Sequence, residues 1–364
     1  MAINTRNKVV AILSMFGLFV APPFAFAGAQ EFNQRGDLLI ADQFNNRVIE
    51  IQPDGEIVWQ FGLGPNDISP NSIVGTNDAQ RVGSLTLMAG TGVPAASPPL
   101  EPKCAAGCAD NRVLFVDKDG HIEWQYGQFG VTGSGPNQLN TPVQTTWTPR
   151  FTVLITDQGN ERVIEVNLNK KIVWQYGQTG VVGSGPDQLN NPNSAELLEN
   201  GHVLIADENN NRAIEVDRNK NVVRAFTVEG TASGVAFASR LPNGNTLITD
   251  SNNSRIVEVD PADHAVWTYL TNLQTGSNPA PLPTRAIRTR TSKTVISDQF
   301  NDRVIIVNMA KHIVAQYGNL NHPGYGTANT SQGLNAPYDA KVVGDYTGLT
   351  PPFEFEFPSD GDNE

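Results

Sequence analysis

Five copies of a D-x-x-N-x-R motif place a carboxylate, an amide and a guanidinium at a fixed spacing. The copies begin at Asp42, Asp157, Asp207, Asp250 and Asp298. Carboxylate and amide oxygens are the hard ligands that calcium takes, so these turns could hold an ion. The aspartate and the arginine of one copy can instead form an ion pair inside the turn. Because a catalytic site needs one asymmetric place and this motif repeats, we favour the turn-forming interpretation and keep calcium as the alternative.

The motif belongs to a longer internal repeat, whose elements must position these side chains. Trp124–Pro142, WQYGQFGVTGSGPNQLNTP, and Trp174–Pro192, WQYGQTGVVGSGPDQLNNP, match at fifteen of nineteen positions. Each unit has short segments rich in valine, isoleucine and aromatic residues, separated by glycine, asparagine, aspartate and proline. This pattern predicts four antiparallel strands per unit. A sixth copy, Asn111–Asp117, keeps only the second half, and six such units predict an all-β, six-bladed β-propeller.

The two ends of the repeat region predict how the ring closes. The first unit begins at Gly36 with its second strand, and Gly333–Val343 after the last unit repeats the first-strand pattern. We therefore expect this C-terminal strand to complete the N-terminal blade, within a propeller that covers residues 28–346. Closure removes the open sheet edges that would invite aggregation.

The repeat pattern FG…G.G…QLN.P…NG.VLIAD..NNR.IEV is similar to the NHL repeat. The resemblance covers nearly all of residues 32–346 and implies a six-bladed propeller, but it implies no particular function, because NHL-like propellers include enzymes, sensors and scaffolds. Arg240–Asp260, RLPNGNTLITDSNNSRIVEVD, also resembles segments of arylsulfotransferase-like propellers, over about one blade.

Histidine separates the enzyme classes that use this fold. Metal-dependent lyases and arylsulfotransferases need histidine aimed at the central cavity, and the loops that usually carry function are the strand 4–1 and strand 2–3 connections. Four of the five histidines, His121, His202, His264 and His312, fall in turns on the opposite face. His322 and the nearby Tyr325 lie on a functional-face loop, so we take both, with the five motif aspartates, as candidate ligand-binding residues. No three-histidine zinc set can be assembled, and we assign no catalytic residue.

Two segments break the repeat. The second unit has an enlarged strand 2–3 loop from about Thr91 to Asp110, and Thr271–Arg288 is a second long connection. Long loops on a rigid scaffold are where specificity tends to lie, although drift in a tolerant loop explains them equally well. The enlarged loop carries both cysteines, Cys104 and Cys108, and in an exported chain we expect them to form a local disulfide.

The N-terminal segment, the net charge and the C-terminal tail indicate where the protein is located and which partners it disfavours. Arg6 and Lys8, a short apolar run and Ala25-Phe26-Ala27 are typical of a secretory signal peptide over residues 1–27, with cleavage near Ala27. An uncleaved anchor is the alternative, but the apolar run is short for a membrane span. Without those two bases, 23 Lys and Arg face 37 Asp and Glu, a net charge of −14. This disfavours nucleic acid and anionic lipid. The acidic tail, residues 347–364, is expected to be disordered.

The sequence therefore predicts a secreted or periplasmic, monomeric propeller that acts as a binding or interaction module for a protein or extracellular ligand, with no cofactor. The alternative is a propeller enzyme, of the lyase, lactonase or arylsulfotransferase-like kind, that uses a central oxygen-ligand metal site or His322.

Overall fold

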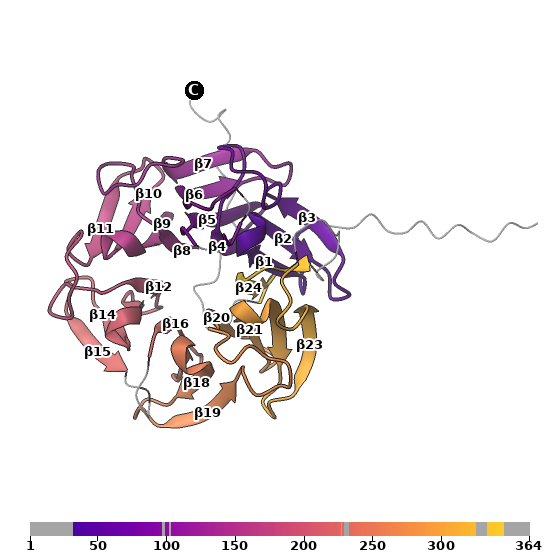
Figure 1. The fold of residues 1–364 in the computed structure, drawn as a ribbon. Helices are drawn as coiled ribbons and strands as arrows, with labels where there is room; N and C mark the ends of the chain where they lie inside the picture. The colour runs from indigo at the N-terminus through magenta and orange to yellow at the C-terminus, as the bar shows by residue number, and fades with distance from the viewer. Residues whose placement is uncertain are drawn as a thin grey trace, which may run out of the picture. The chain divides into compact units, whose positions relative to one another are not determined.

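Six four-stranded antiparallel sheets stand as blades around a ring in the computed structural model (Figure 1). The structure describes residues 32–96, 99–101, 103–226, 228, 233–324 and 333–345. The predicted signal peptide, residue Tyr325 and the acidic tail lie outside these ranges. Within them, no helix is both long and apolar enough to cross a membrane.

Each blade has one strand at each of four positions, counted outward from the ring axis (Figure 1). The inner strands are β24 (Pro337–Val342), β4 (Thr76–Val82), β8 (Pro142–Trp147), β12 (Pro192–Leu197), β16 (Val235–Arg240) and β20 (Arg285–Arg288). The second strands are β1 (Leu38–Asp42), β5 (Leu85–Val93), β9 (Thr152–Asp157), β13 (Val203–Asp207), β17 (Thr246–Asp250) and β21 (Thr294–Asp298). The third strands are β2 (Arg47–Ile51), β6 (Cys108–Val116), β10 (Arg162–Asn167), β14 (Arg212–Val216), β18 (Arg255–Val259) and β22 (Arg303–Val307). The outer strands are β3 (Ile57–Phe61), β7 (Ile122–Gly127), β11 (Ile172–Tyr176), β15 (Val222–Phe226), β19 (Ala265–Leu270) and β23 (Ile313–Gly318). The blades are numbered along the chain: blade 1 holds β24 and β1–β3, blade 2 β4–β7, blade 3 β8–β11, blade 4 β12–β15, blade 5 β16–β19 and blade 6 β20–β23.

A short 3-10 helix joins the second strand to the third in five blades. These helices are η1 (Gln43–Asn45), η2 (Gln158–Asn160), η3 (Glu208–Asn210), η4 (Ser251–Asn253) and η5 (Gln299–Asn301). The residue after each helix adopts the left-handed conformation and turns the chain into the third strand. In blade 2 (β4–β7) the strands β5 and β6 instead continue into a longer hairpin.

The ring closes as the sequence predicts. The C-terminal strand β24 pairs antiparallel with β1, in a register that sets Leu38 opposite Val342 and Ile40 opposite Ala340. The first blade is thus built from both ends of the repeat region, and the predicted six-bladed, all-β fold is confirmed.

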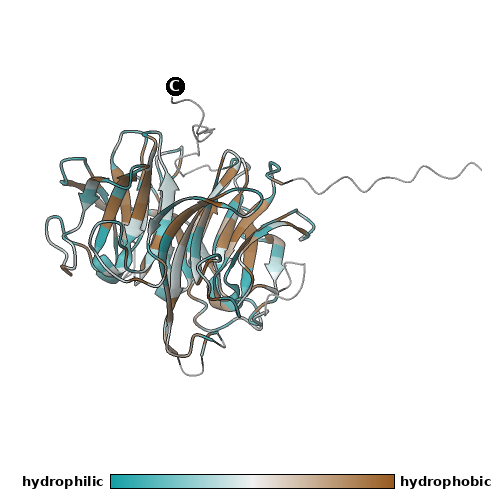
Figure 2. Cartoon of the chain, turned by 90° about the horizontal axis from the view of Figure 1, so that it is seen from above, coloured by the Kyte–Doolittle hydropathy of each residue, from teal (hydrophilic) through white to brown (hydrophobic). Residues whose placement is uncertain are grey.

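The hydrophobic core lies between neighbouring blades, because both faces of each sheet are covered. One buried cluster, for example, joins Leu38 and Ile40 of blade 1 to Val295, Val304 and Tyr317 of blade 6. Figure 2 shows the same arrangement as hydrophobic strands facing one another across the gaps between sheets. At about 25 cal/mol per Å² of buried apolar surface, this repeated packing is the main source of stability.

In four blades an outer-strand tryptophan ties the blade to the next one. The indole nitrogens of Trp59 and Trp124 each donate, at 2.9 Å, to a main-chain carbonyl in the next blade's strand 3–4 turn, and Trp174 and Trp267 do the same at 3.2 and 3.1 Å. Arg224 stands where blade 4 lacks this tryptophan. Its guanidinium donates to the carbonyl of Pro261 at 2.8 Å and pairs with Asp263, so it makes the same link with a different side chain.

Candidate functional site

The motif aspartates each hold their own turn together. In blade 3, the Oδ2 of Asp157 accepts from Arg162 Nε and from Asn160 Nδ2, both at 2.8 Å. The equivalent aspartate–arginine distances in the other four blades are 2.6 to 2.8 Å, and all five carboxylates are buried. Each of these five candidates is thus engaged with the arginine and asparagine of its own copy, and they are spread around the ring.

The same motif also fastens the loops between blades. Asp157 Oδ1 accepts from the main-chain nitrogen of Asn140 at 2.8 Å, and Asn160 Nδ2 donates to the carbonyl of Gly133 at 2.8 Å. Both partners belong to the glycine-rich loop that follows Trp124. The repeated WQYGQ…GSGP segment is therefore a joint between blades, positioned by the aspartate and asparagine of the next turn.

Blade 2 keeps this joint with a different residue. Asp110, two residues before Arg112 instead of five, accepts from the Arg112 Nε at 2.5 Å and from the main-chain nitrogen of Val74 at 2.8 Å. Sequence reasoning missed Asp110 because its spacing departs from the motif. Like Asp157, Asp110 binds its blade's arginine and a main-chain nitrogen of the loop before the blade, and this shared role could be recognised only from the fold.

Burial raises the pKa of several carboxyl groups inside the propeller, so we expect the stability of the fold to depend on pH. The pKa values of Asp78, Asp298 and Asp302 are raised to about 6, in each case chiefly by burial. The folded chain therefore binds protons more tightly than the unfolded chain between about pH 4 and 6. Stability from these groups is fully present below about pH 4 and is lost as the pH rises through 6.

We therefore expect the free energy of unfolding to increase as the pH falls from 8 to 5. Carboxyl groups with lowered pKa values, such as Glu215 and Asp260, have the opposite effect, because they stabilise the fold in their charged form. That stabilisation is lost only in more acidic solution. Guanidinium denaturation at pH 8, 7, 6 and 5 measures the slope. A free energy that stays constant or falls across this range would contradict the expectation.

The histidines lie apart from one another. His322 is exposed, and its Nδ1 is 2.8 Å from the carbonyl of Leu320 in its own loop. His121 and His264 sit exposed beside aspartates in strand 3–4 turns, and His202 contacts Glu215. Among the described residues, one group of histidine and acidic side chains is close enough to share a metal: Asp117, His121 and Glu123, an exposed group in the strand 3–4 region of blade 2.

The structure places a pocket of about 520 Å³ where the repeat is broken. One wall is the hairpin of blade 2: Thr91–Ala95 and Ala106–Ala109. The opposite wall comes from strands β4 and β6 of the same blade, with Asn77 and Asn111, and from turns and loops outside it, with Gln43, Thr132, Thr141 and Gln158. None of these lining residues, all within the described ranges, has an ionisable side chain apart from the disulfide-bonded Cys108.

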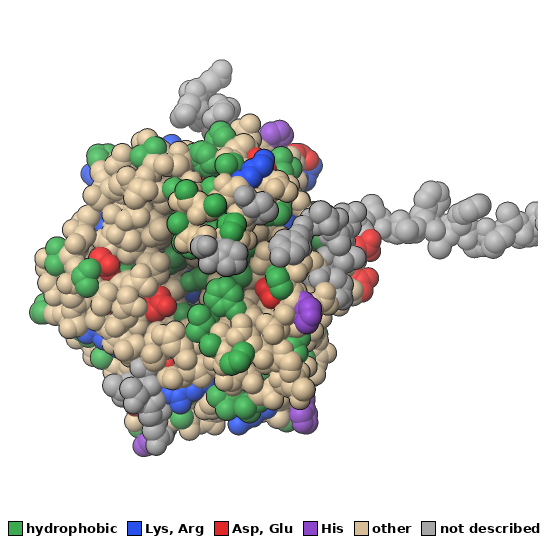
Figure 3. Space-filling model, in the orientation of Figure 1, with side chains coloured by type: hydrophobic (Ala, Val, Ile, Leu, Met, Phe, Trp, Pro, Cys, Tyr) green, Lys and Arg blue, Asp and Glu red, His purple; other side chains and the backbone are tan. Residues whose placement is uncertain are grey.

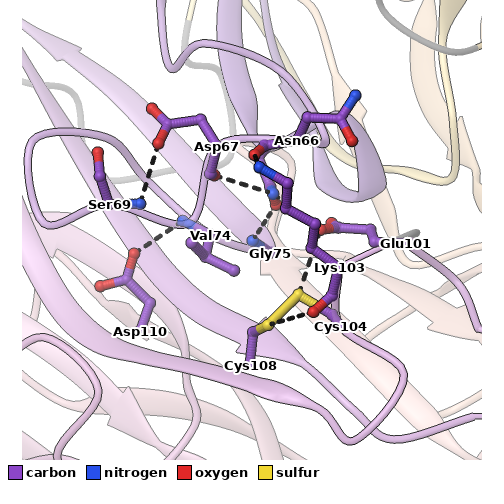
Figure 4. Close-up of a disulfide and its surroundings, with 11 residues drawn as sticks. Asn66, Asp67, Ser69, Val74, Gly75, Glu101, Lys103, Cys104, Cys108 and Asp110 are labelled. Atoms are coloured by element: carbon purple, nitrogen blue, oxygen red, sulfur yellow. Dashed lines mark hydrogen bonds between the residues drawn. A yellow bond between two sulfur atoms is a disulfide. The ribbon is translucent and has the colours of Figure 1, made fainter.

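Glycines and a disulfide shape the hairpin wall. Gly75 and Gly92 pack so closely that a Cβ on Gly75 would lie 2.0 Å from the carbonyl oxygen of Gly92, and both have positive φ. Beyond them, Val93 pairs with Cys108, and a disulfide links Cys108 to Cys104 (Figure 4). The close backbone approach and the crosslink bend this hairpin into one side of the pocket.

The polar wall is held in place by its own hydrogen bonds. Gln43 Nε2 donates to Asn77 Oδ1 at 2.8 Å, and Gln43 Oε1 accepts from Gln299 at 2.8 Å. Asn111 Nδ2 donates to Thr132 Oγ1 at 2.9 Å, while its Oδ1 accepts from the main chain of Thr141. The amides of this wall are therefore oriented before any ligand arrives, which lowers the entropic cost of binding.

Two buried charged groups lie among the inner strands. Arg285 of blade 6 donates to Asn193 Oδ1 at 2.9 Å and to the carbonyl of Val143, in blade 3, at 3.3 Å. Lys341 of β24 lies between Asp78 and Asp339 and contacts both carboxylates. All of these side chains are buried. Arg285 thus connects blades across the ring axis, and the Lys341 cluster connects the neighbouring blades 1 and 2.

Comparison with known proteins supports the fold. No family model and no curated protein sequence matches the chain. A protein of unknown function from Bacteroides caccae is 14% identical, with a TM-score of 0.54 over 78% of this chain and 93% of its own. Virginiamycin B lyase from Staphylococcus aureus is 13% identical, with a TM-score of 0.51 over 78% and 81%. Identities this low carry the propeller architecture alone, so the resemblance to NHL repeats stays a prediction.

Proposed function

We propose that this chain is an exported, NHL-like propeller that binds an uncharged segment of a partner protein in the pocket beside the blade 2 hairpin. The observation that carries the proposal is the position of the pocket, at the place where one blade departs from the repeat. A rigid ring supports it, and the altered loop supplies one wall. Its volume of about 520 Å³ falls in the range of about 300–1,000 Å³ that is usual for ligand pockets.

The chemistry of the walls favours an uncharged peptide. One wall offers oriented amides and hydroxyls, which pair with the N–H and C=O groups of a main chain, and the other offers small apolar side chains such as Val93 and Ala109. A charged ligand group would lose its hydration and find no opposite charge among the lining residues. Figure 3 shows one face of the ring, on which hydrophobic side chains gather toward the centre and charged ones lie as isolated spots.

Binding is favoured over catalysis for the same reason. A lyase or a hydrolase needs a general base or a nucleophile within hydrogen-bond reach of its substrate. The lining residues supply amides, threonine hydroxyls and a disulfide, and the exposed His322 does not line the pocket.

A library of tetrapeptides, acetylated and amidated so that both ends are neutral, tests the proposal. Ligand-observed NMR should detect binding by peptides of Gly, Ala, Val, Ser, Thr, Asn and Gln, and weaker binding when Asp or Lys is introduced. Ala109→Trp fills the pocket and should weaken binding by about 30-fold or more, since contacts at the centre of a site are worth about 2 kcal/mol. Ala262→Trp, at an exposed turn of blade 5, is the matched control. Binding that is absent, or equal in both variants, contradicts the proposal.

A further inference from the structure

A buried carboxyl group lies against the disulfide of the blade 2 hairpin. Glu101 is completely buried, and its Oε2 is 3.6 Å from Cys104 Sγ (Figure 4). A disulfide sulfur has no hydrogen to donate, so this contact becomes a hydrogen bond only when the carboxyl group carries the proton. Asn46 donates to the same oxygen at 2.8 Å, while Oε1 has no hydrogen-bond partner among the described residues.

The orientation of Asn46 is fixed by a second hydrogen bond. Its Oδ1 accepts from the main-chain nitrogen of Gly75 at 2.8 Å, so its amide nitrogen must face Glu101. The surrounding side chains do not supply a cation. Lys103 Nζ donates to the carbonyl of Asn66, and Arg112 is paired with Asp110. Asp67, whose carbonyl lies 3.5 Å from Asn46 Nδ2, is itself acidic.

A buried carboxylate without a counter-ion is costly, so the acid is held in its protonated form. Burial raises the pKa of Glu101 to about 8, opposed only by the hydrogen bond from Asn46. At neutral pH the proton is therefore present on the carboxyl group that touches the sulfur.

The two sulfur atoms of the disulfide differ in how accessible they are to an incoming thiolate. Cys104 is 1% exposed, whereas Cys108 is partly exposed and lines the pocket. An incoming thiolate therefore reaches Cys108, and the sulfur that leaves is that of Cys104, beside Glu101. The crosslink encloses only three residues, so in the chain-entropy view it constrains the unfolded state less than a long-range disulfide does. The fold can therefore remain intact when this bond is broken.

We propose that Cys104–Cys108 is a thiol–disulfide exchange site, in which Cys108 is the attacked sulfur and Glu101 is the proton donor to Cys104. A thiolate of a small thiol or of a protein dithiol attacks Cys108 Sγ, forms a mixed disulfide and breaks the Cys104–Cys108 bond. The electron pair of that bond leaves on Cys104, which takes the proton of Glu101 and becomes a thiol. Glu101, now a carboxylate, accepts from the new S–H and is reprotonated from solvent. A second thiolate then attacks the reductant's sulfur in the mixed disulfide, which releases Cys108 as a thiolate and yields the oxidised reductant.

The test uses the full chain, with glutathione as the probe, and needs no pocket ligand, so it is independent of the proposed function. Rates of reduction are followed from pH 6 to 9 by acid quenching, alkylation and mass spectrometry, and are divided by the concentration of glutathione thiolate. For the unmodified chain, this normalised rate should be constant below about pH 8 and fall above it. Early in the reaction, glutathione should be found on Cys108.

Glu101→Gln keeps the size and the hydrogen bond from Asn46 but has no proton to give. It should react about 100-fold more slowly, the lower end of general acid catalysis, with a normalised rate that no longer depends on pH. Glu123→Gln, an exposed acid of the same blade, is the matched control and should react like the unmodified chain. A pH-independent normalised rate in the unmodified chain, glutathione found on Cys104, or an unchanged rate in folded Glu101→Gln would each overturn the proposal. The first two measurements need no variant.

Discussion

Replacing Lys341 by methionine is expected to lower the free energy of unfolding by about 3–5 kcal/mol, which is the usual cost of removing one partner from a buried ion cluster. Lys341 Nζ lies 2.8 Å from Asp78 Oδ1, contacts Asp339, and donates to the carbonyl of Ala79 at 2.9 Å. The side chains of the three charged residues are at most 4% exposed. Without the ammonium group, two carboxylates would share a site that has no other cation in contact with them among the described residues.

The position of this cluster makes it important for the closure of the ring. Lys341 and Asp339 belong to the closing strand β24, and Asp78 belongs to β4 of the next blade. Asp339 also accepts from the main-chain nitrogen of Ala79 at 3.3 Å. The cluster therefore holds the C-terminal strand against blade 2, so its loss weakens the closure of the ring as well as the local packing.

The pH dependence separates the loss of charge from the loss of packing. Burial raises the pKa of Asp78 to about 6, and protonation of this carboxyl group removes the repulsion in Lys341→Met, so the difference from the unmodified chain should be smaller at pH 5 than at pH 8. Guanidinium denaturation at both pH values measures this difference.

Lys171→Met, at an exposed turn, is the control and should change the stability little. In the triple variant that adds Asp78→Asn and Asp339→Asn, much of the loss should be recovered, since no uncompensated charge remains. A loss that is the same at both pH values, and that the triple variant does not recover, would show that packing alone accounts for it.

The fold could be predicted from the sequence because the patterns that specify it lie within short segments and are repeated along the chain. Turn residues, alternating strands and the displaced first-strand copy at Gly333–Val343 each report on neighbours in the chain. Six copies of one unit have one reasonable way to bury their hydrophobic faces, which is side by side in a closed ring. The C-terminal closure followed from the same pattern, and the pairing of β24 with β1 confirms it.

The contacts that cross between blades could not be predicted in this way. Arg224 substitutes for a tryptophan by reaching Pro261 and Asp263, which lie 37 and 39 residues away in the chain. Arg285 reaches Val143 across the ring, 142 residues away. Neither position resembles its counterparts in the other blades, and residue type alone does not say which neighbour a side chain will meet.

The candidate site was indicated by the enlarged loop that interrupts the repeat in blade 2, and less by any motif. The enlarged loop with Cys104 and Cys108 could be recognised as exceptional, but its glutamate could not. Nothing in the sequence separates Glu101 from the other acids, since its burial depends on how the hairpin folds back over Asn46. His322 stood out by its residue type and its loop, yet it lies exposed and does not line the pocket.

The five copies of the D-x-x-N-x-R motif should differ in what they contribute, and blade 6 should depend most on its arginine. In the Arg303–Asp298 pair both side chains are 0% exposed, whereas Arg212, paired with Asp207 in blade 4, is 22% exposed. Asp207 also accepts from the main-chain nitrogen of Asn190 at 2.8 Å. In blade 6 the residue at the position of Asn190 is Pro281, whose carbonyl accepts from the main-chain nitrogen of Phe300 as that of Asn190 accepts from Asn209. Proline has no main-chain N–H to donate, and Asp298 Oδ1 has no hydrogen-bond partner among the described residues.

Arg303→Met is therefore expected to lower the free energy of unfolding by about 3–5 kcal/mol, and Arg212→Met by about 1 kcal/mol. Methionine keeps most of the apolar stem in both variants, so the comparison isolates the guanidinium group. In Arg212→Met, water can reach the vacated position and Asp207 keeps its other two donors. In Arg303→Met, Asp298 would be left buried with the amide of Asn301 as its remaining partner.

Because protonated Asp298 needs no counter-ion, the loss of stability in Arg303→Met should become smaller as the pH is lowered from 8 to 5. The loss in Arg212→Met should change less. Denaturation of both variants at the two pH values measures this. Equal losses in the two blades would mean that the motif contributes through its turn geometry and not through the buried ion pair.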